Sequence, residues 1–305
     1  MVEKSAKIWM DGKFVDWDSA QVHVLSHALH YGSAAFEGIK CYKTPKGPAI
    51  FQLKKHVDRL FGSALIFGMK IPYSPKEISD AIKGTVTVNG LTDCYIRPIA
   101  YLGYGPMGLN PVDSPVRCSI AAWAWGAYLG EEGMKKGIRL RTSSFTRHYV
   151  NSMMTKAKIS GNYANSVLAK REAVTQGFDE ALMLDTEGYV SECTGENIFI
   201  VKENAIKTTP PTSILPGITR ASIMRIAKDS GYDVAEERFT RDELYLADEC
   251  FLTGTAAELT PVREVDSRQI GEGKPGKVTS SLQKMFLDIV HGKSKKYEKW
   301  LEYLK

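Results

Sequence analysis

One lysine in residues 153–166, M-M-T-K-A-K-I-S-G-N-Y-A-N-S, has the surroundings of a reactive amine. Lys158 stands where a run of small and apolar residues meets Gly161, a setting that removes the water favouring the ammonium form. Burial and a nearby cation lower the pKa of a lysine from about 10.4 toward neutrality, as Schiff-base and general-base lysines require. An exposed lysine before a helix cap also fits this stretch, so other motifs must decide.

A carboxylate and two anion-binding turns elsewhere in the chain complement such a lysine. Glu192 lies in residues 188–197, where backbone amides would keep it ionised to hold a protonated ring nitrogen. Residues 213–220, S-I-L-P-G-I-T-R, end a loop and open a helix whose free N–H groups favour a phosphate. Residues 253–257 form a second small-residue turn of this kind. A surface hairpin, a helix cap and an ordinary turn are the alternative interpretations.

Together these groups match the needs of pyridoxal 5′-phosphate: an amine for its aldehyde, a partner for its ring nitrogen and a cup for its phosphate. Other chemistries fit less well. Residues 271–277 approach a P-loop, but Val278 stands where Ser or Thr would bind magnesium. His23, His27 and His30 lack a nearby carboxylate, so we expect no metal. The chain has no G-x-S-x-G motif to indicate a hydrolase of that type.

Length and composition indicate a soluble globular protein of about two domains. The 305 residues are 43% hydrophobic and 25% charged, which argues against disordered and fibrous classes. A net charge of +5 indicates neither a nucleic-acid nor a membrane partner, and we find no signal peptide or membrane-spanning run. The five cysteines are scattered and odd in number, so we expect a reducing, cytoplasmic location without disulfides.

The hydrophobic patterns predict an α+β fold with an N-terminal domain over residues 1–125 and a C-terminal domain over residues 138–305, which contains the candidate cofactor-binding groups described above. Residues 126–137 contain four glycines and no apolar period, so we expect an interdomain linker there. We expect a hairpin over residues 7–16 and helices over 53–69, 75–88, 163–177, 218–231 and 278–291. We expect strands over 49–52, 94–101, 116–125, 138–146, 181–185, 189–191, 197–201, 234–239 and 250–253.

Nine blocks of sequence follow one another between residues 8 and 278. They are SHALHYGSAAFEGIK at 26–40, HVDRL at 56–60, YIRP at 95–98, WGAYLG at 125–130, AKISGNY at 157–163, SECTGENIF at 191–199, LPGITR at 215–220, YLADE at 245–249 and GTAAELTPV at 254–262. In order and spacing they resemble the branched-chain amino acid aminotransferases of the fold-type IV pyridoxal-phosphate family. The resemblance implies the two-domain fold of D-amino acid aminotransferases, with a small α/β domain and a larger strand-rich one.

The resemblance also implies a role for each residue of the cofactor site. Lys158, rather than Lys156, would form the internal aldimine and then carry the proton between the substrate Cα and the cofactor C4′. Tyr163 would hydrogen-bond the phenolic oxygen of the cofactor, and Glu192 would keep its ring nitrogen protonated. The remaining cofactor residues would be Leu215 and the phosphate-binding Arg59, Ile218, Thr219 and Thr255.

The same resemblance implies a substrate pocket. The α-carboxylate would bind Thr255, Ala256 and Ala257, with Tyr95 assisting, and Arg97 would bind the distal carboxylate of glutamate. The side-chain pocket would be lined by Phe36, Gly38, Met107, Trp125, Tyr163 and Gly195, with Tyr31 and Tyr128 at its mouth. Cys193 and Ile-Ser-Gly after the lysine replace residues found in some relatives, small changes that leave these roles intact.

The implied activity is reversible amino transfer between L-leucine, L-isoleucine or L-valine and 2-oxoglutarate, as in branched-chain amino acid biosynthesis. In the family a neighbouring subunit completes the pocket, so a homodimer is the minimum, and bacterial and archaeal relatives often form hexamers. A D-amino acid aminotransferase or an aminodeoxychorismate lyase would keep the fold and the cofactor. A protein that binds the cofactor without catalysis is a further alternative.

Overall fold

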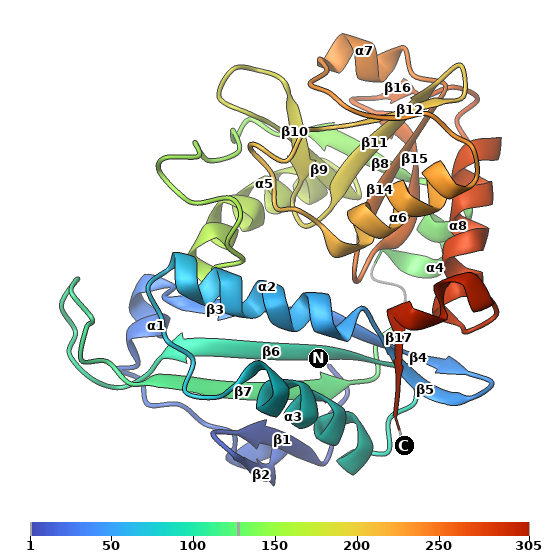
Figure 1. The fold of residues 1–305 in the computed structure, drawn as a ribbon. Coiled ribbons are helices and arrows are strands. Elements are labelled where there is room, and N and C mark those ends of the chain that lie inside the picture. The colour runs from blue at the N-terminus through green and yellow to red at the C-terminus, as the bar shows by residue number, and fades with distance from the viewer. Residues whose placement is uncertain (1, 127–128, 305) are drawn as a thin grey trace. The chain divides into compact units, whose positions relative to one another are not determined.

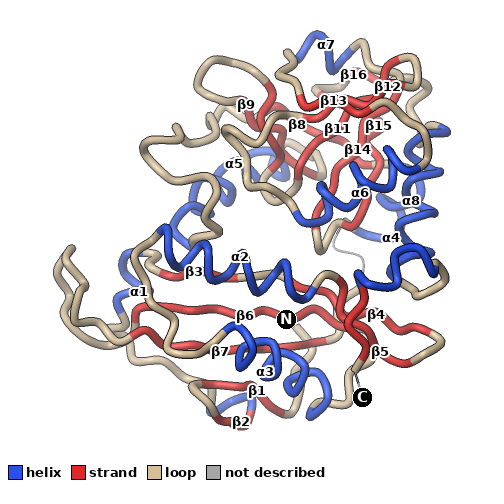
Figure 2. Tube along the Cα trace, in the orientation of Figure 1, coloured by secondary structure: helices blue, strands red, loops and turns tan. Residues whose placement is uncertain are grey.

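The computed structural model describes residues 2–126 and 129–304, and the chain divides into two compact units (Figure 1). Unit 1 comprises Met1–Trp125, Ala157–Asn162 and Ile289–Lys305, and unit 2 comprises Gly126–Lys156 and Tyr163–Asp288. Residues 157–162 and 289–305 therefore belong to unit 1, although we expected both in the C-terminal domain. Each unit combines helices with one sheet (Figure 2), so the predicted α+β class is confirmed.

Unit 1 is built on an eight-stranded antiparallel sheet of order β17-β5-β4-β6-β7-β1-β2, with β3 paired to β6. Its strands are β1 (Lys7–Met10), β2 (Lys13–Asp16), β3 (Ala34–Phe36), β4 (Ile39–Thr44), β5 (Gly47–Phe51), β6 (Cys94–Leu102), β7 (Val116–Trp123) and β17 (Leu301–Tyr303). The predicted hairpin is confirmed as β1 and β2, which Asp11 (φ 47°) and Gly12 (φ 90°) join with the positive φ of a tight turn.

Helices α1 (His27–Tyr31), α2 (Leu53–Ile66) and α3 (Pro75–Val88) complete unit 1 with three short 3₁₀ turns, η1 (Trp17–Ser19), η2 (Ser160–Asn162) and η3 (Lys295–Trp300). Helix α3 begins where predicted, because Ser74 and Glu77 form a capping box and Pro75 occupies the first turn. Buried residues of α2 and α3, such as Leu60 and Ile82, share one core with strands β4 and β6.

Unit 2 is built on a nine-stranded mixed sheet of order β10-β9-β8-β15-β14-β11-β12-β13, with β16 paired to β15. Its strands are β8 (Ile138–Thr142), β9 (Glu180–Leu184), β10 (Val190–Cys193), β11 (Asn197–Lys202), β12 (Ala205–Thr208), β13 (Val234–Glu236), β14 (Glu249–Gly254), β15 (Glu258–Val265) and β16 (Arg268–Gln269). Its helices are α4 (Gly130–Lys136), α5 (Tyr163–Thr175), α6 (Ile218–Asp229), α7 (Arg241–Tyr245) and α8 (Lys277–Val290). Strands β12, β15 and β16 were not predicted, and in β15 Pro261 interrupts the strand pattern.

Helix α4 occupies most of the stretch in which we expected a linker. Its apolar pattern is weak, but Glu131 and Glu132 lie in the first turn and Lys135 and Lys136 in the last. These charges complement the helix dipole and form two i,i+4 ion pairs. Charge rather than apolar periodicity therefore accounts for this helix.

Two further features concern membrane-spanning helices and disulfide bonds. None of the described helices has the length and apolar character that crossing a bilayer requires. All five cysteines are free thiols, and all five are buried.

Candidate active site

Lys158 is held by its backbone at the edge of strand β3 in unit 1. Its amide N donates to Ser63 Oγ (2.9 Å), and its carbonyl oxygen accepts from the Phe36 amide (3.1 Å). Its Nζ lies 4.8 Å from the centre of the Phe36 ring. The neighbouring Lys156 belongs to unit 2, where its Nζ lies 3.4 Å from the Thr212 carbonyl oxygen. The two lysines are therefore two residues apart in the sequence but belong to different units.

Arg59 is paired with a fully buried carboxylate that the sequence analysis did not single out. Its Nε donates to Glu37 Oε1 (2.6 Å) and its Nη2 to Glu37 Oε2 (2.9 Å), while His56 Nδ1 lies 2.7 Å from Oε2. Burial alone would raise the pKa of Glu37, but the charge of Arg59 and the bond to His56 lower it to about 2. The carboxylate is therefore ionised and fixes the orientation of Arg59.

Several predicted substrate residues of unit 1 contact one another. Arg97 Nη2 donates to the Tyr95 hydroxyl (3.1 Å), and its guanidinium lies 4.9 Å from the Phe36 ring centre. The Tyr95 ring meets that of Trp125 edge-on at 4.6 Å between centres. A Cβ on Gly38 would lie 1.9 Å from the Tyr95 hydroxyl oxygen, so any larger residue there would require Tyr95 to shift. The result is an aromatic cluster that holds the Arg97 guanidinium, with the Lys158 amine also against its Phe36 ring.

Arg97 also has an unsatisfied donor in that cluster. Its Nε is buried and has no hydrogen-bond acceptor among the described residues. A buried donor without an acceptor is unfavourable, so an acceptor supplied by a bound molecule would stabilise the site. This finding fits the predicted role of Arg97 toward a carboxylate.

Tyr31 and Met107, the other predicted pocket residues of unit 1, are joined by a hydrogen bond. The Tyr31 hydroxyl donates to the Met107 carbonyl oxygen (3.0 Å). The buried His27 lies 2.7 Å from Ser33 Oγ through Nδ1 and 3.1 Å from the Gly108 carbonyl oxygen through Nε2. These bonds tie α1 to residues 107–108, which explains His27 without a metal.

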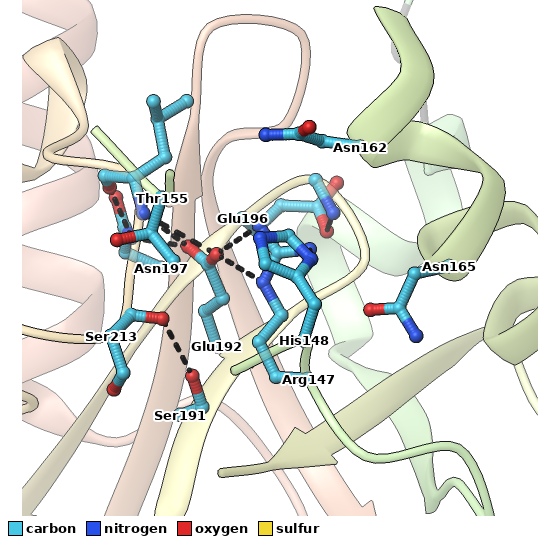
Figure 3. A network of polar contacts seen from close by, with 12 residues as sticks. Arg147, His148, Thr155, Asn162, Asn165, Ser191, Glu192, Glu196, Asn197 and Ser213 are labelled. Carbon is cyan, nitrogen blue, oxygen red and sulfur yellow. Dashed lines mark hydrogen bonds and ion pairs between the residues drawn. The ribbon is translucent and has the colours of Figure 1, made fainter. Parts of the chain in front are cut away.

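In unit 2, Glu192 forms a buried ion pair with Arg147 (Figure 3). Nη2 and Nε of Arg147 lie 2.8 and 2.9 Å from Glu192 Oε1. Strand β10 shifts register against β9 between Val190 and Glu192, and such a bulge re-aims side chains. Breaking a buried pair by removing one partner costs about 3–5 kcal/mol, because the other charge stays buried. Arg147 was not identified from the sequence, because this residue lies in no recognisable motif.

The other oxygen of Glu192 is bound to the loop that precedes α6. Asn197 Nδ2 donates to Glu192 Oε2 (3.0 Å) and to the Leu215 carbonyl oxygen (3.0 Å), and the Leu215 amide lies 3.3 Å from both carboxylate oxygens. A Cβ on Gly217 would lie 2.1 Å from Asn197 Oδ1. Asn197 therefore connects Glu192 to the start of α6.

Helix α6 begins in a way that suits an anion. Gly217 is the N-cap and provides no side-chain cap, and the buried Ile218 and Thr219 form the first turn. The first amides of a helix lack intrahelical partners and lie at the positive end of its dipole. The predicted phosphate site at Ile218 and Thr219 is therefore compatible with the structure.

The second predicted anion turn joins β14 to β15. Thr255, Ala256 and Ala257 lie between Gly254 and Glu258, which are paired across the turn. Thr260 Oγ1 donates to the Ala257 carbonyl oxygen (2.7 Å). A Cβ on Gly254 would lie 3.3 Å from Glu196 Cγ, so this turn packs closely against the strand pair that carries Glu192.

Two more predicted residues belong to unit 2, and a third lies outside the described residues. Tyr163 opens α5 and is partly buried, and Gly195 lies between β10 and β11 with open space beside its Cα. The Gly195 amide donates to the buried Glu196 carboxyl group (3.2 Å). Tyr128 lies outside the described residues.

Comparison with known proteins defines the class. Residues 34–265 match the family described as amino-transferase class IV, and the chain belongs to that family. The branched-chain-amino-acid aminotransferase of Pseudomonas aeruginosa is 52% identical over 305 residues, covering 100% of this chain and 99% of that protein. The enzyme of the same name from Escherichia coli K12 is 45% identical over 302 residues, with 98% of each chain covered.

A solved structure agrees with this assignment. The Escherichia coli branched-chain amino acid aminotransferase superposes with a TM-score of 0.97 at 44% identity, and the match covers 99% of this chain and 100% of that one. A further branched-chain amino acid aminotransferase, solved with pyridoxamine 5′-phosphate, superposes with the same TM-score of 0.97 at 53% identity over 99% of each chain. The predicted fold-type IV architecture is therefore confirmed.

Proposed function

We propose that this protein is a branched-chain amino acid aminotransferase that uses pyridoxal 5′-phosphate. The observation that carries the proposal is the full-length similarity to relatives of that name, at 52% and 45% identity. The described geometry supports it, because the ion-paired Glu192, the uncapped start of α6 and the anchored Lys158 suit the three parts of this cofactor.

The cofactor, when bound, supplies an aldehyde that takes up the amino group and a ring that withdraws electrons. We assign its binding to Arg59, Lys158, Tyr163, Glu192, Leu215, Ile218, Thr219 and Thr255. Glu192 would hold a proton on the ring nitrogen, since Arg147 and Asn197 keep its carboxylate oriented. Amides and hydroxyls at Ile218, Thr219 and Thr255 would bind the phosphate, and Arg59 would add a positive charge.

Lys158 would carry the proton in the reaction. Its amine would hold the cofactor covalently and, once released, would take the proton from the substrate Cα. The Phe36 ring beside Nζ shields the amine from water on one side. Lysine suits both tasks because its pKa responds strongly to burial and neighbouring charge.

The aromatic cluster of unit 1 suits substrates of two kinds. Phe36, Tyr95 and Trp125 offer apolar contact to the side chains of leucine, isoleucine and valine. The unsatisfied Nε of Arg97 suits the distal carboxylate of glutamate or 2-oxoglutarate. We further propose that Tyr31, Gly38, Met107, Tyr128 and Gly195 complete the pocket, and that Ala256 and Ala257 bind the α-carboxylate with Thr255.

We also propose a homo-oligomer, at least a dimer, in which a neighbouring subunit completes the pocket, and a cytoplasmic location, in keeping with five free cysteines. The domain division at residues 126–137 remains a prediction. The oligomeric state, the location and the roles of the site residues are proposals that go further than membership of the family.

Substrate turnover tests the proposal directly. Purified enzyme is supplied with 2-oxoglutarate and either L-leucine or D-alanine, and glutamate formation is followed. We expect turnover of L-leucine. Turnover of D-alanine but not of L-leucine would contradict the assignment. Lys158→Ala should abolish the visible absorbance of the lysine-bound cofactor, and an unchanged spectrum would place the reactive amine elsewhere, with Lys156→Ala as the matched control.

A further inference from the structure

Unit 2 contains a pocket that shares no residue with the proposed cofactor site. Its volume is about 510 Å³, and it is a shallow hollow that is largely open to solvent. Four of its lining side chains are cationic, Lys135, Lys136, Arg263 and Lys274, and Ser280 adds a hydroxyl. Neither an aromatic ring nor a carboxylate lines it. Its composition therefore points to an anion rather than to an apolar or cationic molecule.

Regular elements position these cations. Helix α4 supplies Lys135 and Lys136, strand β15 supplies Arg263, and α8 supplies Ser280 (Figure 1). Gln283 Nε2 on α8 donates to the carbonyl oxygens of Met134 on α4 (3.0 Å) and Leu259 on β15 (3.0 Å). The three elements are thereby joined, so the pocket is a fixed feature of unit 2.

Arg263 is the least exposed of the four cationic residues that line the pocket. Its Nε is buried and has no hydrogen-bond acceptor in the part of the chain that the structure describes. A Cβ on Gly137 would lie 3.2 Å from Arg263 Cβ, so the glycine lets the arginine pack closely against the end of α4. A buried donor without an acceptor is unfavourable. Arg263 also lines the pocket, where a guanidinium can bind an anion through charge-assisted hydrogen bonds.

The lysines are paired only through exposed contacts. Lys136 lies 3.0 Å from Glu132 and Lys274 lies 2.7 Å from Glu272, and all four side chains are largely exposed. Exposed pairs of this kind contribute little to stability, so the lysines can turn toward a multivalent ligand at small cost. Lys135 likewise lies 3.6 Å from the exposed Glu131. None of these carboxylates is a lining residue of the pocket, although Glu132 is close enough to interact with the charge of Arg263.

The start of α8 does not itself attract the anion. Its amides at Val278 and Thr279 already donate to Glu249, at 3.0 and 2.7 Å. Recognition must therefore come from the cationic side chains. A guanidinium among several ammonium groups suits a molecule with two or more phosphate or carboxylate groups.

We propose that this pocket binds a small multivalent oxyanion, held by Arg263 and the lysines around it. The pocket is distinct from every residue assigned to the cofactor or the substrate. Binding there would proceed alongside catalysis, since the two sites share no side chain.

Calorimetric titration of the cofactor-loaded enzyme tests this assignment. Pyrophosphate and citrate serve as the phosphate and carboxylate probes, each at constant ionic strength set with sodium chloride. Loading with cofactor keeps the probes from the proposed phosphate cup at α6. We expect saturable binding of at least one probe with one site per chain, and the stronger probe identifies the anionic group preferred. No saturable binding of either would overturn the proposal.

Variants locate the binding. Arg263→Gln should weaken the affinity about tenfold, as expected for loss of one charge-assisted contact. The exposed Lys274→Ser should weaken it without risk to the fold, and Lys202→Ser is its control, because Lys202 is also exposed and ion-paired, with Asp248. Equal binding in Arg263→Gln, Lys274→Ser and the control would show that the anion binds elsewhere and would refute the site.

Discussion

The guanidinium of Arg147 lies 2.8 Å from the carboxylate of Glu192, and both side chains are buried. This pair gives Glu192 a fixed negative charge next to the loop that starts α6. A carboxylate that is to keep a ring nitrogen protonated must itself stay ionised, and burial alone works against that. In the function we propose, Arg147 would therefore be a positioning residue behind Glu192.

We predict that Arg147→Met destabilises the protein and weakens retention of the cofactor. The free energy of unfolding should fall by about 3–5 kcal/mol, because Glu192 would remain buried without its partner. Urea unfolding and the visible spectrum after dialysis measure the two effects. The exposed Arg171→Met is the matched control, and equal stability of the two variants would show that the pair contributes nothing.

Gly38→Ala should impair substrate binding through Tyr95. The new methyl group would lie 1.9 Å from the Tyr95 hydroxyl oxygen, so the tyrosine must move away from Arg97. We expect KM for both L-leucine and 2-oxoglutarate to rise at least about tenfold, an effect of about 1.4 kcal/mol.

Two controls accompany this substitution. Gly62→Ala places a methyl group in open space on α2 and should leave activity unchanged while stabilising the helix by about 0.5–1 kcal/mol. The clash in Gly38→Ala should also lower the free energy of unfolding, and adding Tyr95→Phe, which removes the clashing hydroxyl, should recover part of that loss. Normal kinetics for Gly38→Ala would exclude the contact as a determinant of binding.

Much of the fold was predictable because its signals are local. The cap at Ser74 predicted the start of α3, and Glu192 was singled out as a candidate from its own motif. The partners of these residues were not predictable in the same way. Arg147 lies 45 residues before Glu192, and the need for glycine at position 38 arises from Tyr95 on another strand. Pairings of this kind depend on tertiary structure, which a single sequence does not reveal.

Gly217→Ala should weaken phosphate binding at α6. Its methyl group would lie 2.1 Å from Asn197 Oδ1, so Asn197 must give up its bonds to Glu192 and Leu215. We expect a rise in the cofactor dissociation constant of about tenfold or more, measured by titrating the apoenzyme. Asn197→Ala removes the same bonds, so adding it to Gly217→Ala should cause little further loss. Unchanged affinity in Gly217→Ala, or fully additive losses in the double variant, would contradict this coupling.

Glu196 should make stability fall as pH rises. Burial, followed by the negative charge of Glu180, raises the pKa of Glu196 from 4.5 to about 8. Between these pH values the folded chain binds more protons at this carboxyl group than the unfolded chain does. The free energy of unfolding therefore decreases with pH, by about 1.4 kcal/mol per unit.

Glu196→Gln keeps the shape of the side chain and an oxygen for the Gly195 amide, but it cannot ionise. Its free energy of unfolding should exceed that of the wild type increasingly from pH 5 to pH 8, as measured by urea titration at fixed protein concentration. The exposed Glu187→Gln is the control and should follow the wild-type profile. Parallel profiles for the wild type and Glu196→Gln would show that Glu196 titrates normally, since a carboxyl group with equal pKa in both states adds no slope.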